Sequence, residues 1–390
     1  MRLHFAPSRA IMICLLGLLS LPAYANTAVV DCTGATPGAF TTINAAINSL
    51  PPIGPNTVTV TAGPCTGPIL VFRYTDLGIF AGAPVTVQAA VPTQRVMSIF
   101  DSHNVGISGP FTFDGGRGAV IQKYSTVDID GLTIQNSGGL GLTSLDSSVH
   151  ISNSVIKNSV RSGVSVNGGI FSVDSGVAIT GNGRTGISAG TAHLTLNGGD
   201  GTPGTEINIS NNVTVGVALF NSSEADINSD TRIDHNGGIG LEVFHTSTVL
   251  MTDGEINSNT GIGVHCGETS HCEWAGATTI NTNLGGGIEI TDHSDAYIDG
   301  GITISGNTGT GVLVDLSSLL NSLGGNFITN NSDDGIIVNT LSVIKFAAND
   351  TVTGNGKLAL ECNNGSLVSG DVATYKPKKC GPAFQAQPIK

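Results

Sequence analysis

Short stretches in which apolar and polar residues alternate recur along most of this chain. Val264–Cys266 and Ile288–Ile290 are two examples, each with an apolar residue on either side of a polar one. Alternation over a few residues predicts a strand that is buried on one face, and Ile and Val suit such strands. These copies contain no apolar stripe with the period of a helix. The pattern therefore predicts an all-β protein.

The strands belong to a repeat whose most constant member is Asn. Its copies follow one another every 23 or 24 residues and continue less regularly upstream: Asn212, Asn236, Asn259, Asn283, Asn307, Asn331 and Asn355, preceded by Asn182, Asn158, Asn136 and Asp114. A β-branched residue stands three positions before each Asn from Asn158 onward, beginning with Val155 and ending with Val352. Gly follows four positions after most copies. A unit this short cannot bury its own apolar face, so neighbouring copies must stack.

Three strand fragments per copy predict a parallel β-helix, a solenoid of about 22 to 24 residues per coil. Equivalent residues of successive coils would then lie about 4.8 Å apart. We expect the Asn to tolerate a left-handed backbone at a bend and to pass amide hydrogen bonds between coils, and the Gly to supply backbone freedom at the next bend. A leucine-rich repeat has a similar period, but it needs regularly spaced Leu and helix formers, whereas these copies are rich in Ile, Val, Thr, Ser and Gly.

The repeated "I-x-x-N-x-x-x-G-I-x-V" resembles the right-handed parallel β-helix repeats of the pectin lyase-like superfamily. Phe40–Leu50 and the strand that follows from Asn56 are similar to the short amphipathic helix and first strand that cap such helices. The resemblance implies the fold. It leaves the activity open, because the superfamily includes lyases, hydrolases, esterases, epimerases and proteins without a catalytic role.

The N-terminal segment predicts export. Arg2 and Arg9 flank the start, an apolar run follows, and "PAYA" precedes Asn26, so residues 1–25 form a predicted signal peptide. We divide the rest into an N-terminal cap and first coils (26–110), regular β-helix repeats (111–375) and a C-terminal tail (376–390). The expected location is secreted, periplasmic or extracellular.

Six cysteines remain after the signal peptide, an even number that predicts disulfides in an exported chain. Pairing between sequence neighbours is the arrangement we favour among fifteen combinations: Cys32 with Cys65, Cys266 with Cys272, and Cys362 with Cys380. Such bonds would fasten both ends of the solenoid and one turn in its middle.

Charge limits the partners. Loss of two arginines and no acidic residue with the signal peptide takes the formal net charge from −13 to −15. Nucleic acid is therefore an unsuitable partner, and a polyanionic sugar would be repelled unless Ca²⁺ intervened. We expect polysaccharide or cell-wall material as the partner, no membrane insertion, and a monomer. The cofactor is left open, with Ca²⁺ or another divalent cation as the candidate.

The motif sets of familiar enzymes in the superfamily are missing. Asp333 and Asp334 resemble one part of a polygalacturonase site but have no partner set, and two solvated turn carboxylates explain them. "RIDH" at Arg232 resembles a pectate lyase motif only faintly. Trp274 stands alone, and a single tryptophan makes a poor sugar platform.

Stacking the copies brings a candidate site together. The variable, outward residue of the strand after each Gly is, coil by coil, Ser165, Ser188, Ala218, Glu242, His265, Glu289, Leu313, Ile337 and Glu361. Glu242, His265 and Glu289 are our candidate catalytic residues, as an acid, a base or the ligands of a cation. The next turns add candidate substrate-binding residues: His245, Asp292, His293 and Asp315. The competing explanation is that outward polar residues serve solubility.

Two functions remain open. The first is an exported β-helix protein that binds or processes polysaccharide, as a lyase or hydrolase. The alternative is a non-catalytic structural or adhesive repeat protein at the cell surface or outside the cell. One insertion, which includes Asn197–Gly204, would form either a lip beside the candidate site or a surface loop without a role there.

Overall fold

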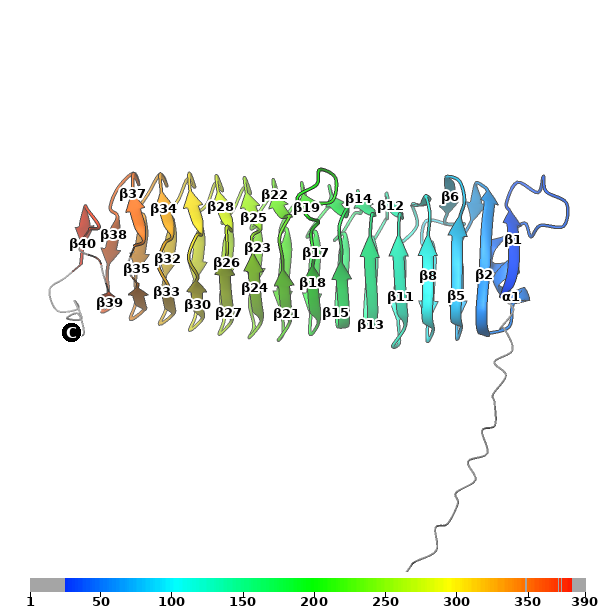
Figure 1. Cartoon of the computed structure of the whole chain (residues 1–390), viewed down its shortest axis with the longest axis horizontal. Coiled ribbons are helices and arrows are strands. Elements are labelled where there is room, and N and C mark those ends of the chain that lie inside the picture. Colours follow the sequence, from blue (N-terminus) through cyan, green and yellow to red (C-terminus); the bar gives the residue numbers. More distant parts are fainter. Residues whose placement is uncertain (1–24, 348, 371, 373, 381–390) are drawn as a thin grey trace, which may run out of the picture.

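The computed structural model describes residues 25–347, 349–370, 372 and 374–380. The chain winds into a long stack of coils, with α1 (Ile43–Ser49) at one end and β40 (Lys378–Lys379) at the other (Figure 1). The stack has about 13 coils of roughly 24 residues. All but the last residue of the predicted signal peptide lies outside the described residues, as do residues 381–390 of the predicted tail.

Each regular coil contains three short strands in a fixed order, which we call row one, row two and row three. Rows one and two together form a 27-stranded sheet, in which β13 (Leu142–Ser152) and β15 (Val164–Val173) span both rows. Row three forms a 13-stranded sheet. All strand pairs within the described residues are parallel, so equivalent residues of successive coils lie side by side.

Besides β13, β15 and β40, row one contains β4 (Ile69–Phe72), β7 (Met97–Phe100), β10 (Ala119–Gln122), β17 (Ile187–Gly190), β20 (Val217–Phe220), β23 (Leu241–Val243), β26 (Val264–Cys266), β29 (Ile288–Ile290), β32 (Val312–Val314), β35 (Ile336–Val338) and β38 (Leu360–Cys362). Row two contains β1 (Asn26–Asp31), β2 (Ile53–Ala62), β5 (Thr75–Ala81), β8 (His103–Ser108), β11 (Thr126–Asp130), β18 (His193–Leu196), β21 (Glu224–Ile227), β24 (Thr248–Thr252), β27 (His271–Ala275), β30 (Asp295–Ile298), β33 (Leu319–Ser322), β36 (Val343–Phe346) and β39 (Leu367–Gly370). Row three contains β3 (Cys65–Thr66), β6 (Val85–Gln88), β9 (Phe111–Asp114), β12 (Thr133–Gln135), β14 (Val155–Lys157), β16 (Ala178–Thr180), β19 (Ile207–Ser210), β22 (Thr231–Asp234), β25 (Glu255–Asn257), β28 (Thr279–Asn281), β31 (Thr303–Ser305), β34 (Phe327–Thr329) and β37 (Thr351–Thr353).

The core is a continuous column of apolar side chains inside the coils. Ile233, Ile256 and Ile280 of row three, for example, lie in register and are fully buried. Burying a side chain of this size contributes roughly 1.5–3 kcal/mol. Because each coil buries its apolar face against the coils before and after it, the repeat is stable only as a stack.

The predicted Asn ladder is present at the bend between row three and row one. Its members from Asn182 to Asn355 follow one another in register, and each backbone N–H and side-chain Nδ2–H donates to Oδ1 of the next Asn at 2.9–3.2 Å. The left-handed residue is the one before the ladder Asn, such as His235 or Thr282, rather than the Asn itself. The ladder thus satisfies buried amides while its neighbour makes the bend.

Upstream of Asn182 the predicted repeat was wrong by one residue. Ile156, not Val155, is paired with Ile179 and is fully buried. Ser159 therefore occupies the ladder position, and its N–H donates to Oδ1 of Asn182 at 3.0 Å. Asn158 is the left-handed residue before it.

The recurrent Gly has a different cause from the one expected. Seven copies share one environment: Gly186, Gly216, Gly240, Gly263, Gly287, Gly311 and Gly335. None has a positive φ, but a Cβ on any of them would lie 2.4–2.7 Å from a methyl group of the β-branched residue in the next coil. Close approach of consecutive coils, not backbone freedom, requires Gly here.

A second ladder runs along the turn between row one and row two. Each Ser N–H donates to the hydroxyl of the next Ser at 3.1–3.2 Å: Ser223, Ser247, Ser270, Ser294, Ser318 and Ser342. The two residues before each of these serines in the middle coils, such as His245 and Thr246, have positive φ. This paired left-handed turn makes a sharp corner between the two rows.

All three predicted disulfides form, joining Cys32 to Cys65, Cys266 to Cys272, and Cys362 to Cys380. The predicted capping helix is α1, whose N-cap Thr42 accepts a hydrogen bond from the Ala45 amide and whose Ile43, Ala46 and Ile47 are buried. Within the described residues, no helix has the length and apolar character needed to cross a membrane.

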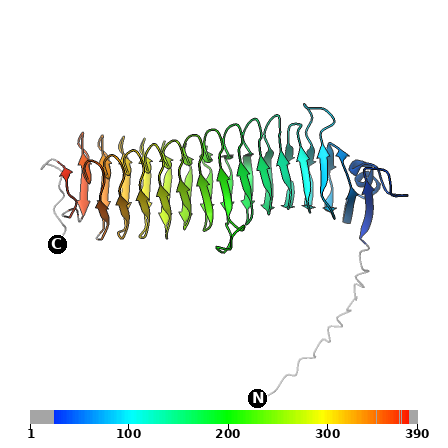
Figure 2. The ribbon, with the colours of Figure 1, turned by 90° about the horizontal axis from the view of Figure 1, so that it is seen from above.

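The predicted insertion joins row two to row three, between β18 and β19, and protrudes in green from the regular coils (Figure 2). Its backbone at Gly201 donates to the carboxylate of Asp230 in the following coil. Because the candidate residues belong to row one, this loop does not form a lip beside them.

Candidate functional site

Three consecutive coils bring the candidate catalytic residues together on the outer face of row one. Glu242 of β23 pairs with His265 of β26, which pairs with Glu289 of β29. The alternation in each strand sends these side chains outward while their neighbours enter the core. All three are half-buried. The predicted register is therefore confirmed, whereas the role of these residues is a proposal.

His265 is held by a hydrogen-bond relay rather than by either glutamate. Its Nε2 lies 3.1 Å from Oγ1 of Thr291, and that hydroxyl donates to Oδ2 of Asp292 at 3.1 Å. Since the hydroxyl hydrogen is used on Asp292, Oγ1 of Thr291 accepts the hydrogen of His265 Nε2. This bond fixes the tautomer and leaves Nδ1 available, as is typical of an imidazole placed for acid–base work.

Burial raises the pKa of Glu242 above its ordinary value. The neighbouring His265 lowers this pKa, and the carboxylate of Glu268 raises it again, but both effects are smaller than that of burial. Desolvation disfavours the charged form of a carboxyl group, so Glu242 holds a proton at higher pH than an exposed glutamate does. A carboxyl group of this kind is suited to donate a proton.

The predicted substrate-binding residues occupy the corner between rows one and two. Nε2 of His245 lies 2.5 Å from a carboxylate oxygen of Glu268 in the next coil. These two line an open depression of about 580 Å³ together with Asn221, Ser222, Thr246 and Thr269. Glu242, His265 and Glu289 are not among the residues that line this depression.

The remaining predicted residues lie on the same corner with different environments. Asp292 orients Thr291, and His293 is exposed in the next turn position. Asp315 accepts a hydrogen bond from the amide of Leu316 at 2.7 Å and one from the side chain of Asn339 at 3.2 Å. The carboxylate of Asp315 thus binds donors of its own turn and of the next coil.

Sequence reasoning missed a pair of aromatic rings beside Glu242. Phe220 ends β20, and Phe244 follows β23 at the equivalent place in the next coil, with ring centroids 5.8 Å apart and planes inclined by 23°. A Cβ on Gly190, one coil earlier, would lie 2.5 Å from the Phe220 ring, so that ring covers the glycine. The signal was present in the sequence as two phenylalanines 24 residues apart, each two positions after an outward residue.

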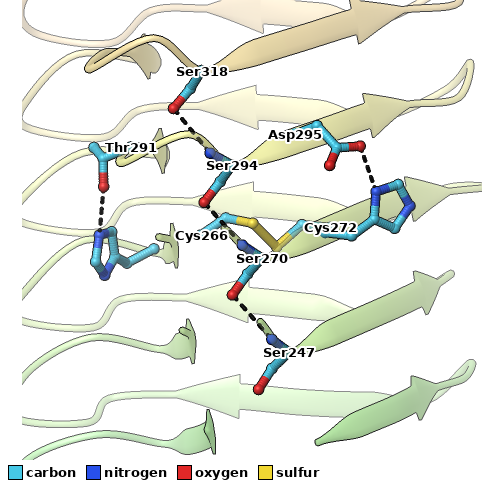
Figure 3. Close-up of a disulfide and its surroundings, with 10 residues drawn as sticks. Ser247, Cys266, Ser270, Cys272, Thr291, Ser294, Asp295 and Ser318 are labelled. Atoms are coloured by element: carbon cyan, nitrogen blue, oxygen red, sulfur yellow. Dashed lines mark hydrogen bonds and ion pairs between the residues drawn. A yellow bond between two sulfur atoms is a disulfide. The ribbon is translucent and has the colours of Figure 1, made fainter. Parts of the chain in front are cut away.

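Trp274, in contrast, points inward and is fully buried. The Cys266–Cys272 disulfide ties row one to row two inside the coil that carries His265. Figure 3 places Thr291 and Asp295 on opposite sides of this disulfide and of the serine ladder. The Asp295 side is the outer face of row two, which is therefore separate from the candidate site.

Row two has histidine–carboxylate contacts of its own. His150 lies 3.4 Å from Asp128 and 2.8 Å from Asp174, and His271 lies 2.6 Å from Asp295. Each histidine contacts a carboxylate of a neighbouring coil, so these contacts tie coils together.

Within the described part of the chain, no group of three or more His, Cys, Asp and Glu side chains is arranged to hold a metal ion. The interpretation of Asp333 and Asp334 as two solvated turn carboxylates is wrong for Asp334, which is 3% exposed. Asp333 pairs with Lys357, while Asp334 is buried and accepts the amide of Leu358 at 2.9 Å. Burial raises the pKa of Asp334.

The family comparison agrees with the observed architecture. Residues 117–278 match the family model of the right-handed beta helix region. The chain folds as a right-handed parallel β-helix. Among curated proteins, none matches this β-helix. The matched residues include Glu242 and His265 but end before Glu289.

Several solved structures are similar to this chain at low sequence identity. The A-module of an Azotobacter vinelandii mannuronan C-5 epimerase is 11% identical, covers 89% of this chain and 94% of its own, and has a TM-score of 0.47. A periplasmic alginate epimerase is 11% identical over 82% of this chain and 79% of its own, with a TM-score of 0.44. A tailspike protein of an Escherichia coli O157:H7 bacteriophage is 13% identical over 80% and 46%, with a TM-score of 0.38.

Proposed function

We propose that this β-helix binds a polysaccharide along the outer face of row one and cleaves it by hydrolysis at Glu242, His265 and Glu289. The observation that carries the proposal is the half-buried Glu242, whose pKa is raised by burial, in register with a histidine and a second carboxylate. Paired carboxyl groups in different environments are typical of glycosidic bond cleavage.

The spacing fits an inverting mechanism. Glu242 and Glu289 are two coils apart, so their backbones are separated by roughly 9 to 10 Å. Inverting glycosidases place a water molecule between carboxyl groups that are about 6.5–9.5 Å apart. A sugar lying over His265 would therefore have one carboxyl group on each side.

The step balances with these three residues and one water molecule. Glu242, in its protonated form, donates its proton to the glycosidic oxygen as the bond from that oxygen to the anomeric carbon breaks. Glu289 takes a proton from the water whose oxygen bonds to the same carbon. His265 lies between the two carboxyl groups and can return the proton from Glu289 to Glu242, which restores the starting state.

Two further features support a sugar polymer as the ligand. The rings of Phe220 and Phe244 provide an apolar surface next to Glu242, and aromatic rings pack against the apolar faces of sugars. Row one also continues through successive coils on both sides of the site, which gives the length of surface that a linear polymer requires. The three disulfides support our expectation of an exported protein, because such bonds persist in oxidising compartments.

The test is a panel of neutral and acidic polysaccharides, assayed for new reducing ends and for unsaturated products that absorb ultraviolet light, with and without a chelator. We expect reducing ends without unsaturation. Glu242→Gln and Glu289→Gln should each lower kcat by roughly 10²- to 10⁴-fold. Glu273→Gln, on the outer face of row two, is the matched control. Full activity of both Glu242→Gln and His265→Ala would remove the proposed site.

A second candidate is binding without catalysis, as expected for a structural or adhesive protein. The shape of the site favours it, because the depression at the corner is open and its lining does not include the three candidate residues. Retention of a polysaccharide by the wild-type protein, with no product from any member of the panel, would decide for this candidate.

A further inference from the structure

Arginines gather on one edge of row one in the N-terminal half of the solenoid. The bend that enters row one has Arg117 before β10, Arg161 before β15 and Arg184 before β17. All three are exposed. Equivalent positions in the coils near the candidate site are occupied by residues without a long side chain: Thr214, Gly238, Gly261, Gly285 and Gly309.

Backbone contacts establish that the arginines are in register. The amide of Arg161 donates to the carbonyl of Gly139 at 3.0 Å, and a Cβ on Gly139 would lie 3.8 Å from Cβ of Arg117. The residue before Arg184, Gly183, approaches the carbonyl of Val160, the residue before Arg161. Arg117, Gly139, Arg161 and Arg184 therefore form a line parallel to the solenoid axis, with neighbours about 4.8 Å apart.

These arginines have no anionic partner among the described residues. The arginine ion pairs in that part of the chain are Arg73 with Asp101 and Arg232 with Glu255. The positive charge of Arg117 contributes, after burial, to lowering the pKa of Arg95 in the preceding coil. Arg95 and Arg117 thus lie close enough to repel each other.

The charges of the solenoid are divided along its axis. Between residues 73 and 184 there are seven basic and seven acidic residues, whereas residues 185–370 contain 20 acidic residues and three basic ones, Arg232, Lys345 and Lys357. The strongly negative net charge is therefore a property of the C-terminal half. The expected repulsion of polyanionic sugars follows from net charge and does not hold for the arginine edge.

The floor beside this edge suits an extended ligand. At the outward positions of row one in these coils, Ser98, Ser165 and Ser188 are half-buried, whereas the short side chains of Val120 and Thr143 are buried. At the far edge Lys123 is exposed, with its Nζ 4.3 Å from the ring centre of Phe100. The strip thus has cations on both edges and the half-buried hydroxyl groups of three serines on parts of its floor.

We propose that Arg117, Arg161 and Arg184 form a track for a linear polysaccharide that carries carboxylate or sulfate groups, laid along the solenoid axis over the N-terminal coils. Guanidinium groups bind either anion through paired N–H donors. Arg95 extends the track at its N-terminal end. The track ends two coils before Glu242, where the arginines stop.

This inference rests on the proposed function only in taking the polymer to be a polysaccharide. It adds that the anionic sugars lie on the N-terminal side of the bond that is cleaved. Beyond Glu242 the corner has Glu268, Asp292 and Asp315, which would repel further anionic units.

The experiment measures binding of the full chain to three soluble probes: dextran sulfate, polygalacturonate and uncharged dextran. The Glu242→Gln background prevents cleavage during the measurement. The triple variant Arg117→Gln, Arg161→Gln and Arg184→Gln is compared with a control of equal charge change, Arg232→Gln, Lys345→Gln and Lys357→Gln. Far-ultraviolet circular dichroism verifies that both variants keep the fold.

We expect one or both anionic probes to bind, dextran not to bind at comparable concentration, and added salt to weaken binding. Each exposed charge contact contributes roughly two- to fivefold, so the arginine variant should bind on the order of ten- to a hundredfold more weakly than the control. The ratio for dextran sulfate and polygalacturonate identifies the preferred anion. Equal binding by the two triple variants, or binding of dextran as tight as that of dextran sulfate, would overturn the track.

The two proposals fail separately. If anionic probes bind through the arginines but no variant or wild-type chain yields products, the track stands and hydrolysis falls. If cleavage depends on Glu242 but the arginine variant binds and cleaves normally, hydrolysis stands and the track falls.

Discussion

Asn259 donates two hydrogen bonds to a single atom of Asn283, from its backbone N–H and from its side-chain Nδ2, each 3.0 Å from Oδ1. Its second Nδ2 hydrogen goes to the carbonyl of Ile233 at 3.0 Å, and its own Oδ1 receives the corresponding pair from Asn236. The amide is fully used inside the protein. Three coils are thereby joined by one buried side chain.

Asn259→Ala should therefore destabilise the solenoid markedly. The substitution leaves the backbone N–H and the Nδ2–H of Asn236 without their acceptor. Oδ1 of Asn283 loses one of its two hydrogen bonds, and the carbonyl of Ile233 loses its side-chain donor. Each buried polar group that loses its partner costs about 1–3 kcal/mol, so we expect a total of roughly 2–5 kcal/mol. The urea midpoint measures this effect. Asn167→Ala, on an exposed residue of β15, is the control, and equal midpoints for the two variants would contradict the prediction.

Gly240 and Gly106 form a matched pair, because the first is closely packed against the next coil and the second is not. A Cβ on Gly240 would lie 2.5 Å from Cγ2 of Ile256 and 2.7 Å from Nδ2 of Asn259, whereas nothing lies within 4 Å of a Cβ on Gly106. Gly240→Ala should cost about 1–3 kcal/mol or more through overpacking. Gly106→Ala should be neutral or slightly stabilising, because Ala lowers the entropy of the unfolded chain. Thermal unfolding midpoints test the contrast, which fails if both variants move alike.

The sequence predicts the register well where the Asn itself recurs, because a fixed period leaves one alignment of the coils. It fails at Asn158, since Ser159 can hold the ladder position and the adjacent left-handed residue is also an Asn. Aligning the Asn residues puts Val155 in the core, whereas the true alignment follows the inward position of Ile156. The glycines were explained by their usual property, backbone freedom, and only the coordinates show how close Ile256 comes to Gly240.

The candidate site was predicted in part for a related reason. Alternation within each strand turns Glu242 and His265 outward, and the repeat period places them side by side, but neither pattern gives their burial, so the raised pKa of Glu242 could not be predicted. Phe220 and Phe244 lie at or just past the strand ends, where the apolar triplet no longer applies. The net charge is a single sum for the whole chain and does not show which bend each charge occupies. The line of arginines could therefore not be predicted from it.

The Phe220–Phe244 pair should contribute to binding of the polysaccharide. Phe220→Ala with Phe244→Ala removes the apolar surface beside Glu242 while leaving the carboxyl groups in place. Aromatic contacts are worth about 0.5–1.5 kcal/mol, so KM should rise roughly two- to tenfold with kcat less affected. Phe327→Ala, on an exposed ring of row three, is the control. Unchanged KM in the double variant would show that the rings serve only to tie the coils together.

Glu242 should make stability depend on pH in a direction opposite to that of an ion-paired carboxylate. Its folded pKa lies above the ordinary value of 4.5, chiefly through burial, so the native state binds the proton more tightly than the unfolded chain does. Stability contributed by this proton is present at pH values below 4.5 and is lost as the pH rises through the folded pKa. Glu242→Gln cannot ionise. Its stability relative to wild type should therefore increase as the pH is raised from about 4 to 8. Urea midpoints across this range measure the difference, with Asn167→Ala as a variant that adds no titratable change. A difference that decreases with pH would show that His265 and the surrounding donors stabilise the charged form more than burial disfavours it.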